Sequence, residues 1–329
     1  IEQAYESTYV VDNANITPPK GFTVTYNANG GTTEVGSEVS TKTFESWLLT
    51  GGGKFVGNTY TFGTKDEDGT LTANYKNNSI NLTTAKKVGY TFTGWYLDSN
   101  CTQALVLNAD GTYTPQKDIT IYAGWSANQV TYKVYRYLEN ANNENYTLYG
   151  DVIEGKAAAG STLTLLTEAN KNQIANTKYV GANLTGGTLG VGTSITTTTV
   201  APDGTTNIYL YYDRNEYTLT LEKNEYIETV TGAGTYKWGA TVAINATVKT
   251  NITGYNASVW DKWTLIEGNG VTVPTTIKGN IVMTAGNITI VANAVKGTPI
   301  TYSVVYNGNG ATGGTTASST HTYDKAQNL

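Results

Sequence analysis

Short segments of this chain recur along its length, and this internal repetition constrains the fold more than any other feature. Residues 22–31 read FTVTYNANGG, and residues 301–310 read TYSVVYNGNG. An aromatic–x–x–Trp motif occurs as FESW at 44–47 and again as FTGW at 92–95. Repetition of this kind is typical of a string of small modules, each with a modest core of its own. We therefore expect an array of modules rather than one large domain.

A second recurring segment closes each expected module. It occurs as LTANY (71–75), IYAGW (121–125), IYLYY (208–212) and IVANA (290–294). Around the second of these, apolar residues fall at every other position from Ile119 to Trp125, which is the pattern of a strand with one buried face. Thr and Tyr suit pleated surfaces, and Asn and Gly suit the turns between strands. The sequence therefore predicts a strand-dominated protein (all-β to α+β), with helical potential at 168–178.

The repeats and their turns divide the chain into six expected segments. These are a linker at 1–20, two related repeat units at 21–78 and 79–127, a different module at 128–214, a divergent repeat at 215–297, and the truncated start of a further repeat at 298–329. Each of the two repeat units has about 50 residues, which is small for an independent core, so we expect them to pack against each other. Because the last repeat stops early, we expect this chain to be part of a longer protein.

Composition excludes several classes of function. The formal net charge is −5, and no cluster of Lys and Arg exists to neutralise phosphates or to bind an anionic lipid surface. No apolar run approaches the roughly 18–20 residues that a membrane-spanning helix needs. The chain has one cysteine, Cys101, so an intramolecular disulfide is impossible. We therefore expect no nucleic-acid partner and no membrane insertion, and we expect packing, or a crosslink of another kind, to hold the modules.

The motifs resemble known bacterial repeats. Residues 22–125, with YNANGG, GYTFTGWYLD and IYAGW, closely resemble the Listeria–Bacteroides repeat, also called the internalin B-repeat. Residues 130–213 are similar to the mucin-binding-protein-like module of Gram-positive surface proteins, and residues 234–294 resemble a divergent internalin B-repeat. The resemblance implies β-grasp-like modules arranged as beads on a string in cell-surface adhesins and cell-wall-associated proteins. It implies no ligand and no fixed set of contact residues.

Few residues offer chemistry, and each has a plainer interpretation. The single histidine, His321, is expected to lie exposed on a strand, and Cys101 in a turn region. Asp66–Gly69 has the carboxylates of a calcium loop without its full ligand spacing, so it fits a hairpin end better. A Lys–Asn isopeptide bond would need a buried carboxylate beside it, which the sequence cannot place. We therefore predict no catalytic residues, no metal and no cofactor.

Aromatic residues are assigned mainly to cores. The predicted core comprises Phe22, Val24, Tyr26, Trp47, Phe92, Trp95, Trp125 and Trp263. Tyr135, Tyr137, Tyr209 and Tyr211 lie on the strand faces opposite other apolar residues, so one of these sets must point outward. These four tyrosines are the predicted contact surface of the chain, because aromatic residues are enriched where proteins bind partners.

These observations favour a non-catalytic segment of an extracellular bacterial protein at the cell surface or cell wall, acting as an adhesin or a stalk. Its expected partners are a protein or glycan ligand on a host or neighbouring cell, or copies of itself. One alternative is a self-assembling fibre or surface layer, in which the strand at 300–306 adds to the sheet of another copy. A second alternative is a set of accessory modules attached to a surface enzyme.

Overall fold

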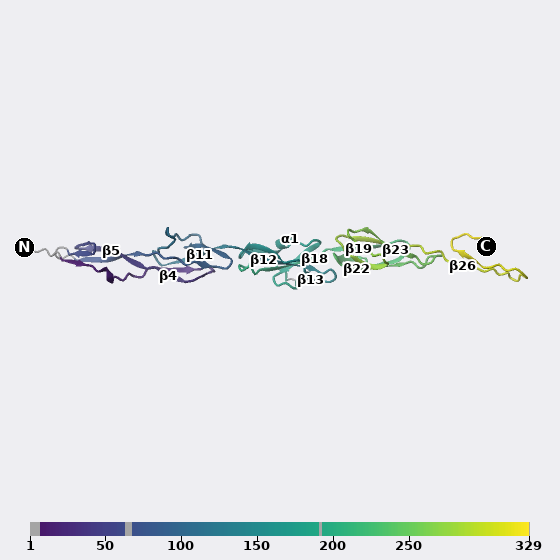
Figure 1. Ribbon diagram of the computed structural model, residues 1–329, viewed down its shortest axis with the longest axis horizontal. Coiled ribbons are helices and arrows are strands. Elements are labelled where there is room, and N and C mark those ends of the chain that lie inside the picture. Colours follow the sequence, from purple (N-terminus) through teal and green to yellow (C-terminus); the bar gives the residue numbers. More distant parts are fainter. Residues whose placement is uncertain (1–6, 63–67, 191–192, 329) are drawn as a thin grey trace, which may run out of the picture. The chain divides into compact units, whose positions relative to one another are not determined.

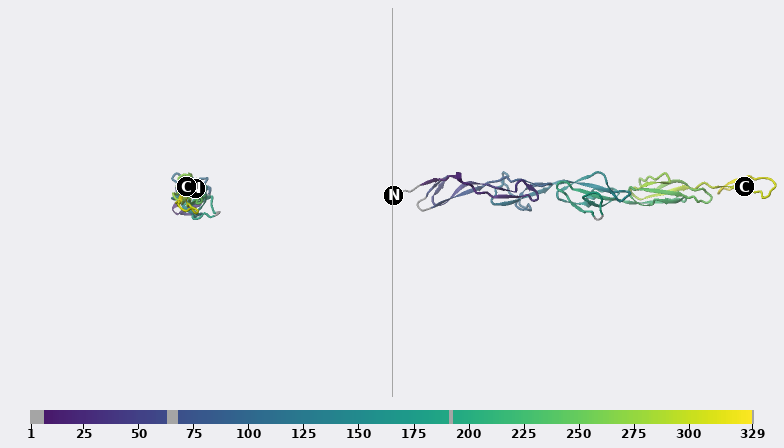
Figure 2. Two further views of the ribbon diagram at one scale, coloured as in Figure 1. Left: turned by 90° about the vertical axis from the view of Figure 1, so that its right-hand side faces the viewer. Right: turned by 90° about the horizontal axis from the view of Figure 1, so that it is seen from below.

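A computed structural model describes residues 7–62, 68–190 and 193–328 of the chain. Strands dominate these residues, and the only α-helix among them is α1 (Leu165–Lys171), which falls at the start of the predicted helical stretch. The strand-dominated class predicted from the sequence is confirmed (Figure 1). The chain forms two compact units: residues 1–131, 156–161 and 200–205 make the first, and the remaining residues make the second. Figure 2 shows the strands from two further directions.

The main sheet of the first unit has four strands in the order β10–β11–β2–β4. Their bounds are β2 (Thr23–Asn27), β4 (Ser37–Val39), β10 (Tyr90–Tyr96) and β11 (Ile119–Ala127). Strands β2 and β11 run parallel, whereas the other two pairs are antiparallel. This one sheet therefore takes strands from both of the repeat units expected at 21–78 and 79–127.

The first unit also contains smaller sheets. Strands β5 (Lys42–Gly51) and β8 (Gly69–Asn77) form an antiparallel pair, and β3 (Thr32–Thr33) pairs with β9 (Ala85–Lys86). A three-stranded sheet has the order β1 (Thr8–Val10), β7 (Thr59–Thr61), β6 (Lys54–Val56), and η1 (Asn13–Asn15) is a 3₁₀ turn. Part of the segment expected to be a linker, 1–20, thus contributes a strand.

The second unit begins with a five-stranded sheet that has β12 and β18 at its centre. The strands are β12 (Gln129–Glu139), which starts in the first unit, β13 (Tyr146–Leu148), β14 (Ile153–Ala158), β16 (Thr177–Asn183) and β18 (Asn207–Arg214). Strands β15 (Thr162–Thr164) and β17 (Thr197–Thr199) form a small hairpin-like pair beside α1. Strands β12 and β18 run parallel.

The rest of the second unit contains two further sheets and a hairpin. One sheet has the order β21 (Gly234–Lys237), β19 (Glu216–Lys223), β25 (Ile288–Val295), β23 (Val259–Glu267). The other has the order β20 (Ile227–Thr231), β22 (Thr241–Val248), β24 (Lys278–Val282). A shared core that includes Leu219, Ile244, Trp263, Ile281 and Ile290 packs these two sheets together. The hairpin consists of β26 (Thr301–Val304) and β27 (Ser319–Thr322).

Three modules share one arrangement of strands. In each, an opening strand (β2, β12 or β19) runs parallel to a closing strand (β11, β18 or β25), and a motif strand (β10, β16 or β23) lies antiparallel on the other side of the closing strand. The same kind of aliphatic pair recurs across the parallel strands: Val24 with Ile119, Val134 with Ile208, and Leu219 with Ile288. A central parallel pair formed by the first and last strands is the sheet arrangement of a β-grasp-like module.

A β-bulge explains the aromatic–x–x–Trp spacing. Residues three apart on a regular strand point to opposite faces, because side chains alternate. In β10 the register shifts between Phe92 and Gly94, so one extra residue is absorbed and Phe92 and Trp95 share a face. Their ring centroids lie 5.3 Å apart, and the Phe44–Trp47 and Trp260–Trp263 pairs, each beside an equivalent bulge, are 5.3 Å and 5.4 Å apart. The recurring motif is therefore the signature of a bulged strand.

Six of the eight predicted core residues belong to a core. Val24, Tyr26, Trp95 and Trp263 are buried. Phe92 and Trp125 are half-buried and pack against the core that contains Val24, Tyr26 and Trp95. Phe22 and Trp47 are half-buried. Modules of this size have too few residues to enclose every aromatic side chain.

Candidate functional site

The four predicted contact tyrosines come together as a ladder on β12 and β18. Tyr135 lies opposite Tyr209 and Tyr137 opposite Tyr211, because the two strands are paired in parallel register. The Tyr135 and Tyr209 rings are stacked with centroids 4.6 Å apart, and the Tyr137 and Tyr211 rings are stacked at 5.2 Å. The alternation of side chains along the two strands therefore suffices to assemble this aromatic surface.

A loop of the same module covers one end of the ladder. The Tyr211 hydroxyl donates to the carbonyl oxygen of Gly187 at 2.8 Å and accepts from Asn183 Nδ2 at 3.1 Å. Gly186 packs so close that a Cβ on it would lie 2.9 Å from Tyr209. Tyr211 is fully buried, and burial raises the pKa of its hydroxyl. Tyr135, Tyr137 and Tyr209 remain half-exposed, so the contact role stays a prediction for these three residues.

A recurring joint links each module to the residues that follow it. The first joint centres on Asn128, the single residue between β11 and β12. Its N–H donates to the carbonyl oxygen of Gly89, and its own carbonyl accepts from the N–H of Ala159, both at 2.9 Å. Gly89 has φ +75°, and a Cβ at this position would lie 2.5 Å from Pro202 O. Only glycine meets both demands without strain.

The second joint has the same pattern with different residues. Asn215 is the single residue between β18 and β19; its N–H donates to Asn176 O at 3.0 Å, and its carbonyl accepts from Trp238 N at 2.8 Å. Asn176 adopts φ +59°, a conformation that asparagine tolerates better than most residues. As at Gly89, this left-handed residue directly precedes the motif strand.

The third joint holds the hairpin of β26 and β27. The N–H of Ile300 donates to Gly254 O at 2.9 Å, and its carbonyl accepts from Tyr323 N at 3.0 Å. Gly254 has φ +76°, and a Cβ there would lie 2.3 Å from the Tyr323 ring. The three joints therefore share one arrangement, in which a connecting residue bonds backward to a left-handed turn and forward to the next element.

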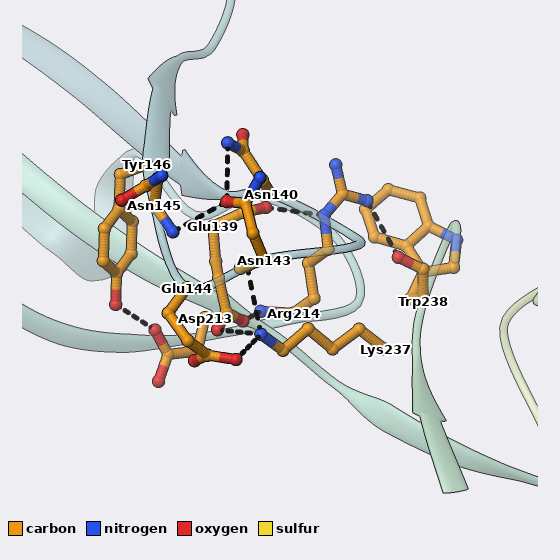
Figure 3. Close-up of polar contacts among 10 residues, drawn as sticks. All are labelled: Glu139, Asn140, Asn143, Glu144, Asn145, Tyr146, Asp213, Arg214, Lys237 and Trp238. Carbon is orange, nitrogen blue, oxygen red and sulfur yellow. Dashed lines mark hydrogen bonds and ion pairs between the residues drawn. The ribbon is translucent and has the colours of Figure 1, made fainter. Parts of the chain in front are cut away.

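Charged side chains reinforce the second joint (Figure 3). Glu139, at the end of β12, has a side chain that is only 7% exposed, and its carboxylate accepts from Lys237 Nζ at 2.7 Å and from Arg214 N at 3.0 Å. Arg214 also donates from Nε to Glu139 O at 2.7 Å and from Nη1 to Trp238 O at 2.9 Å, with its guanidinium over the Trp238 ring. The ends of β12, β18 and β21 are thus tied by hydrogen bonds that involve ionised groups.

The charges of this cluster shift the pKa of its members. Burial opposes the charge on Lys237, but its hydrogen bonds to Glu139 and Glu144 outweigh this effect and raise the pKa of the ammonium group. The same bond to Lys237 lowers the pKa of the exposed Glu144 carboxyl. Nearby, burial and a hydrogen bond to Asp213 raise the pKa of Tyr146. At neutral pH the cluster is therefore held as ion pairs.

The contacts of the lysines bear on the Lys–Asn isopeptide bond considered from the sequence. Two lysines lie 2.7 Å from a buried carboxylate, Lys171 from that of Glu168 and Lys237 from that of Glu139. The other hydrogen-bond partners of Lys237 are the carboxylate of Glu144 and the backbone carbonyl of Asn143. The reaction needs a side-chain amide at that place. These contacts describe an ion-pair cluster, and the Lys–Asn crosslink remains a prediction.

The expectation that His321 is exposed is wrong. It is buried, stacks on Tyr302 with centroids 6.0 Å apart, and its Nε2 lies 2.6 Å from Ser319 Oγ. Ser319 in turn contacts the Tyr306 hydroxyl at 2.8 Å. Because Ser319 and His321 are alternate residues of β27, the strand period alone brings them together. The prediction that the chain is not an enzyme stays a prediction.

Cys101 and the segment Asp66–Gly69 are the remaining candidates for a chemical role. Cys101 is half-buried in a turn with φ +57°, and its Sγ lies 3.6 Å from Ala123 O. Of the segment Asp66–Gly69, the first two residues lie outside the described residues, and Gly69 begins β8. No group of three or more His, Cys, Asp or Glu residues within the described ranges has an arrangement that could hold a metal ion. The described part of the chain also contains no helix with the length and apolar character needed to cross a membrane.

The sequence carries a partial signal for the joints. Asn128 and Asn215 each follow a closing strand directly, and a Gly–Tyr pair occurs both at 89–90 and at 254–255. The hydrogen bonds themselves join residues that are 23 to 46 positions apart, so they could not be derived from local pattern.

Comparison with known proteins supports the repeat assignment for part of the chain. Residues 59–124 match a family described as the Listeria-Bacteroides repeat domain. The match runs from β7 into β11 and includes the FTGW motif and the first four residues of IYAGW. A comparison with curated proteins finds no match. Residues 59–124 are thus similar to the Listeria-Bacteroides repeat domain.

Proposed function

We propose that this chain is a non-catalytic, extracellular segment of a bacterial cell-surface or cell-wall protein, and that its modules act as a stalk. The repeat match supports a place among bacterial surface proteins, for which such repeats are typical. One observation carries the stalk role: the same joint occurs three times, with connectors of one residue in two cases. Short connectors tied by hydrogen bonds on both sides restrict bending, which is what a spacer needs.

A second role, adhesion, is favoured by the tyrosine ladder. Tyr135, Tyr137 and Tyr209 present stacked, half-exposed rings on one sheet face. Aromatic faces of this kind suit a protein or glycan ligand, and repeated weak contacts along an array would add avidity. As part of this proposal, residues 128–214 form a mucin-binding-like module, and the repeats are of the internalin B type.

The stalk proposal is tested by size-exclusion chromatography with light scattering and by negative-stain imaging across a range of concentrations. We expect monomers that are thin and beaded at every concentration. Ordered polymers would instead make assembly the function, and compact particles would contradict both roles. A variant with four glycines inserted after Asn215 is the control, since it lengthens a connector without altering either module, and it should bend more widely in the images.

A further inference from the structure

The ladder face of β12 and β18 carries different residues from the same face of the other two parallel pairs. In each pair the position next to the aliphatic contact points away from the core, because side chains alternate along a strand. In β12 and β18 this position holds Tyr135 opposite Tyr209. The corresponding pairs in the other two modules are Thr25–Thr120 and Thr220–Thr289. The strand arrangement therefore does not require tyrosines here, and their presence calls for another explanation.

Three of the four ladder tyrosines are open to a reagent in solution. Tyr135, Tyr137 and Tyr209 are half-exposed, and their hydroxyls form no hydrogen bond with any other residue that the structure describes. Tyr211 differs, because it is fully buried and its hydroxyl donates to Gly187 O. A reagent that attacks phenols would therefore reach the first three rings and not the fourth.

Ring geometry distinguishes two ways of joining these phenols. Tyr209 and Tyr135 lie face to face, with centroids 4.6 Å and planes 15° apart, whereas Tyr209 and Tyr137 are diagonal neighbours at 6.2 Å and 54°. Neighbouring strands lie about 4.8 Å apart and alternate residues of one strand about 6.6 Å apart, so diagonal residues are separated by about 8 Å. A bond between two ring carbons holds the rings side by side and twisted about that bond. This arrangement fits the diagonal pair, whereas the face-to-face pair would have to unstack.

We propose that Tyr137 and Tyr209 form a site of oxidative crosslinking, at which hydrogen peroxide and a haem peroxidase join β12 to β18 through a carbon–carbon bond. Each phenol gives up one hydrogen atom, as a proton and an electron, and becomes a phenoxyl radical. The two radicals couple at ring carbons adjacent to the oxygens, and the hydrogens on those carbons move to the oxygens and restore both hydroxyls. Hydrogen peroxide takes up the two electrons and two protons and becomes two water molecules.

The bond ties the opening strand of this module to its closing strand. The chain has a single cysteine, so no disulfide within it can serve this purpose. A covalent link between residues far apart in the sequence restricts the unfolded chain and thereby favours the folded module. The inference depends on neither the stalk role nor the binding of a ligand, since it needs only the two phenols and an oxidant.

The test treats the dilute intact chain with a haem peroxidase and limiting hydrogen peroxide at neutral pH. Dityrosine fluorescence and mass spectrometry follow the product. We expect a monomer that is lighter by two hydrogen atoms, formed in a yield that does not depend on protein concentration. Trypsin cleaves after Arg136, so it separates Tyr135 from Tyr137 and shows which of them is linked to Tyr209. We expect the linked peptides to join Tyr137 to Tyr209.

Three phenylalanine variants locate the bond. Tyr137→Phe and Tyr209→Phe each keep the ring and remove the phenol, so each should abolish the linked peptide pair. Tyr135→Phe is the matched control, because it changes a half-exposed ring of the same ladder and should crosslink as the parent chain does. All three variants should keep the circular dichroism spectrum and thermal midpoint of the parent, since the hydroxyls that they lose bond to no other described residue.

Several results would overturn the proposal. One is a linked pair that contains Tyr135 and survives in Tyr137→Phe, because the face-to-face rings would then be the site. Others are a link that persists in Tyr209→Phe, dimers as the only crosslinked product, or no dityrosine under conditions that convert free tyrosine. Loss of the link in Tyr137→Phe and Tyr209→Phe, with its retention in Tyr135→Phe, would support the site.

Discussion

Trp95 connects several parts of the first module through one side chain. Its ring lies 5.0 Å from Tyr26 and 5.3 Å from Phe92, and its Nε1 donates to Thr83 O at 2.8 Å. Trp95→Ala would leave a cavity and an unpaired carbonyl, so we expect a loss of about 3–5 kcal/mol in the free energy of unfolding. Val106→Ala, at a side chain that is 84% exposed, should change it by less than about 0.5 kcal/mol. Urea unfolding followed by circular dichroism measures both.

Comparing alanine variants of two glycines in the first unit distinguishes the cost of backbone strain from the cost of steric contact. Gly89 and Gly111 have nearly the same φ (+75° and +82°), but only Gly89 has a neighbour, Pro202, where a Cβ would be placed. Ala at either position adopts an unfavourable left-handed conformation, which costs about 1–2 kcal/mol. Gly89→Ala must also displace Pro202, so we expect the larger loss of thermal stability and faster proteolysis near residues 128 and 202. Equal effects for the two variants would remove the steric argument.

For single residues, the sequence pattern predicts burial on regular strands but not burial that depends on distant partners. Alternation along the strands and the recurrence of aromatic residues predicted Val24, Tyr26, Trp95 and Trp263 as core, and all four are buried. Burial of His321 was missed, because its stacking partner Tyr302 and its neighbour Ser319 become visible only once β26 and β27 are paired. The tyrosine ladder was placed on one face correctly, but the loop that covers Tyr211 has no periodic signal.

At the scale of elements, the bulge in β10 predicts an asymmetry between insertion and deletion. Phe92 and Trp95 share a face because the bulge absorbs one residue between them. Deleting Thr93 leaves the two aromatic residues two positions apart, which also places them on one face of a regular strand. Inserting one residue after Thr93 places them four positions apart, which on a regular strand moves Trp95 from its position opposite Ala123 to one opposite Ile121. We therefore expect the insertion to lower the midpoint of urea unfolding more than the deletion does.

Strands were easier to predict than their partners. The alternating segments at 22–26 and 119–125 predicted two strands, and both exist as β2 and β11. Their parallel pairing joins Thr23 to Asp118 across 95 positions. Local pattern carries no information on such a pair, because nothing in either segment specifies the register or the direction of a distant neighbour. For this reason the sequence predicts two repeat units with a boundary at residue 78, whereas the main sheet of the structure takes strands from both of them.

At the scale of the whole molecule, the charged cluster of the second joint should control the coupling between neighbouring modules. Lys237→Met leaves the buried Glu139 carboxylate without its ammonium partner, and removing one member of a buried pair typically costs about 3–5 kcal/mol. Glu144→Gln changes the exposed member, at 86% exposure, and should have almost no effect. Urea unfolding of both variants, monitored at Trp238, checks this difference.

The same cluster gives a pH dependence with a defined sign. The pKa of Lys237 is raised in the folded chain, so its contribution is fully present below the ordinary lysine pKa and is lost as pH rises through the folded value. We expect the parent chain to lose stability in strongly alkaline solution more steeply than Lys237→Met does. Identical alkaline profiles of the two proteins would show that this ion pair contributes nothing.

The modular organisation could be predicted from the sequence, whereas the joints could not. Repeated segments such as YNANGG and IYAGW indicated an array, and the structure shows three modules with one strand arrangement. The joints depend on single backbone groups of Asn128, Asn215 and Ile300, whose partners are left-handed turns far away in sequence. Backbone hydrogen bonds of this kind do not depend on the spacing of apolar residues, so hydrophobic periodicity does not predict them.

The parallel pairing of opening and closing strands also determines how each module would respond to tension. The chain enters a module at the start of the opening strand and leaves at the end of the closing strand, so the two points of load lie at opposite ends of one parallel ladder. Pulling then slides the strands past each other and loads all the ladder bonds together, whereas an antiparallel hairpin would open one bond at a time. A load applied along the chain would meet this resistance in each of the three modules.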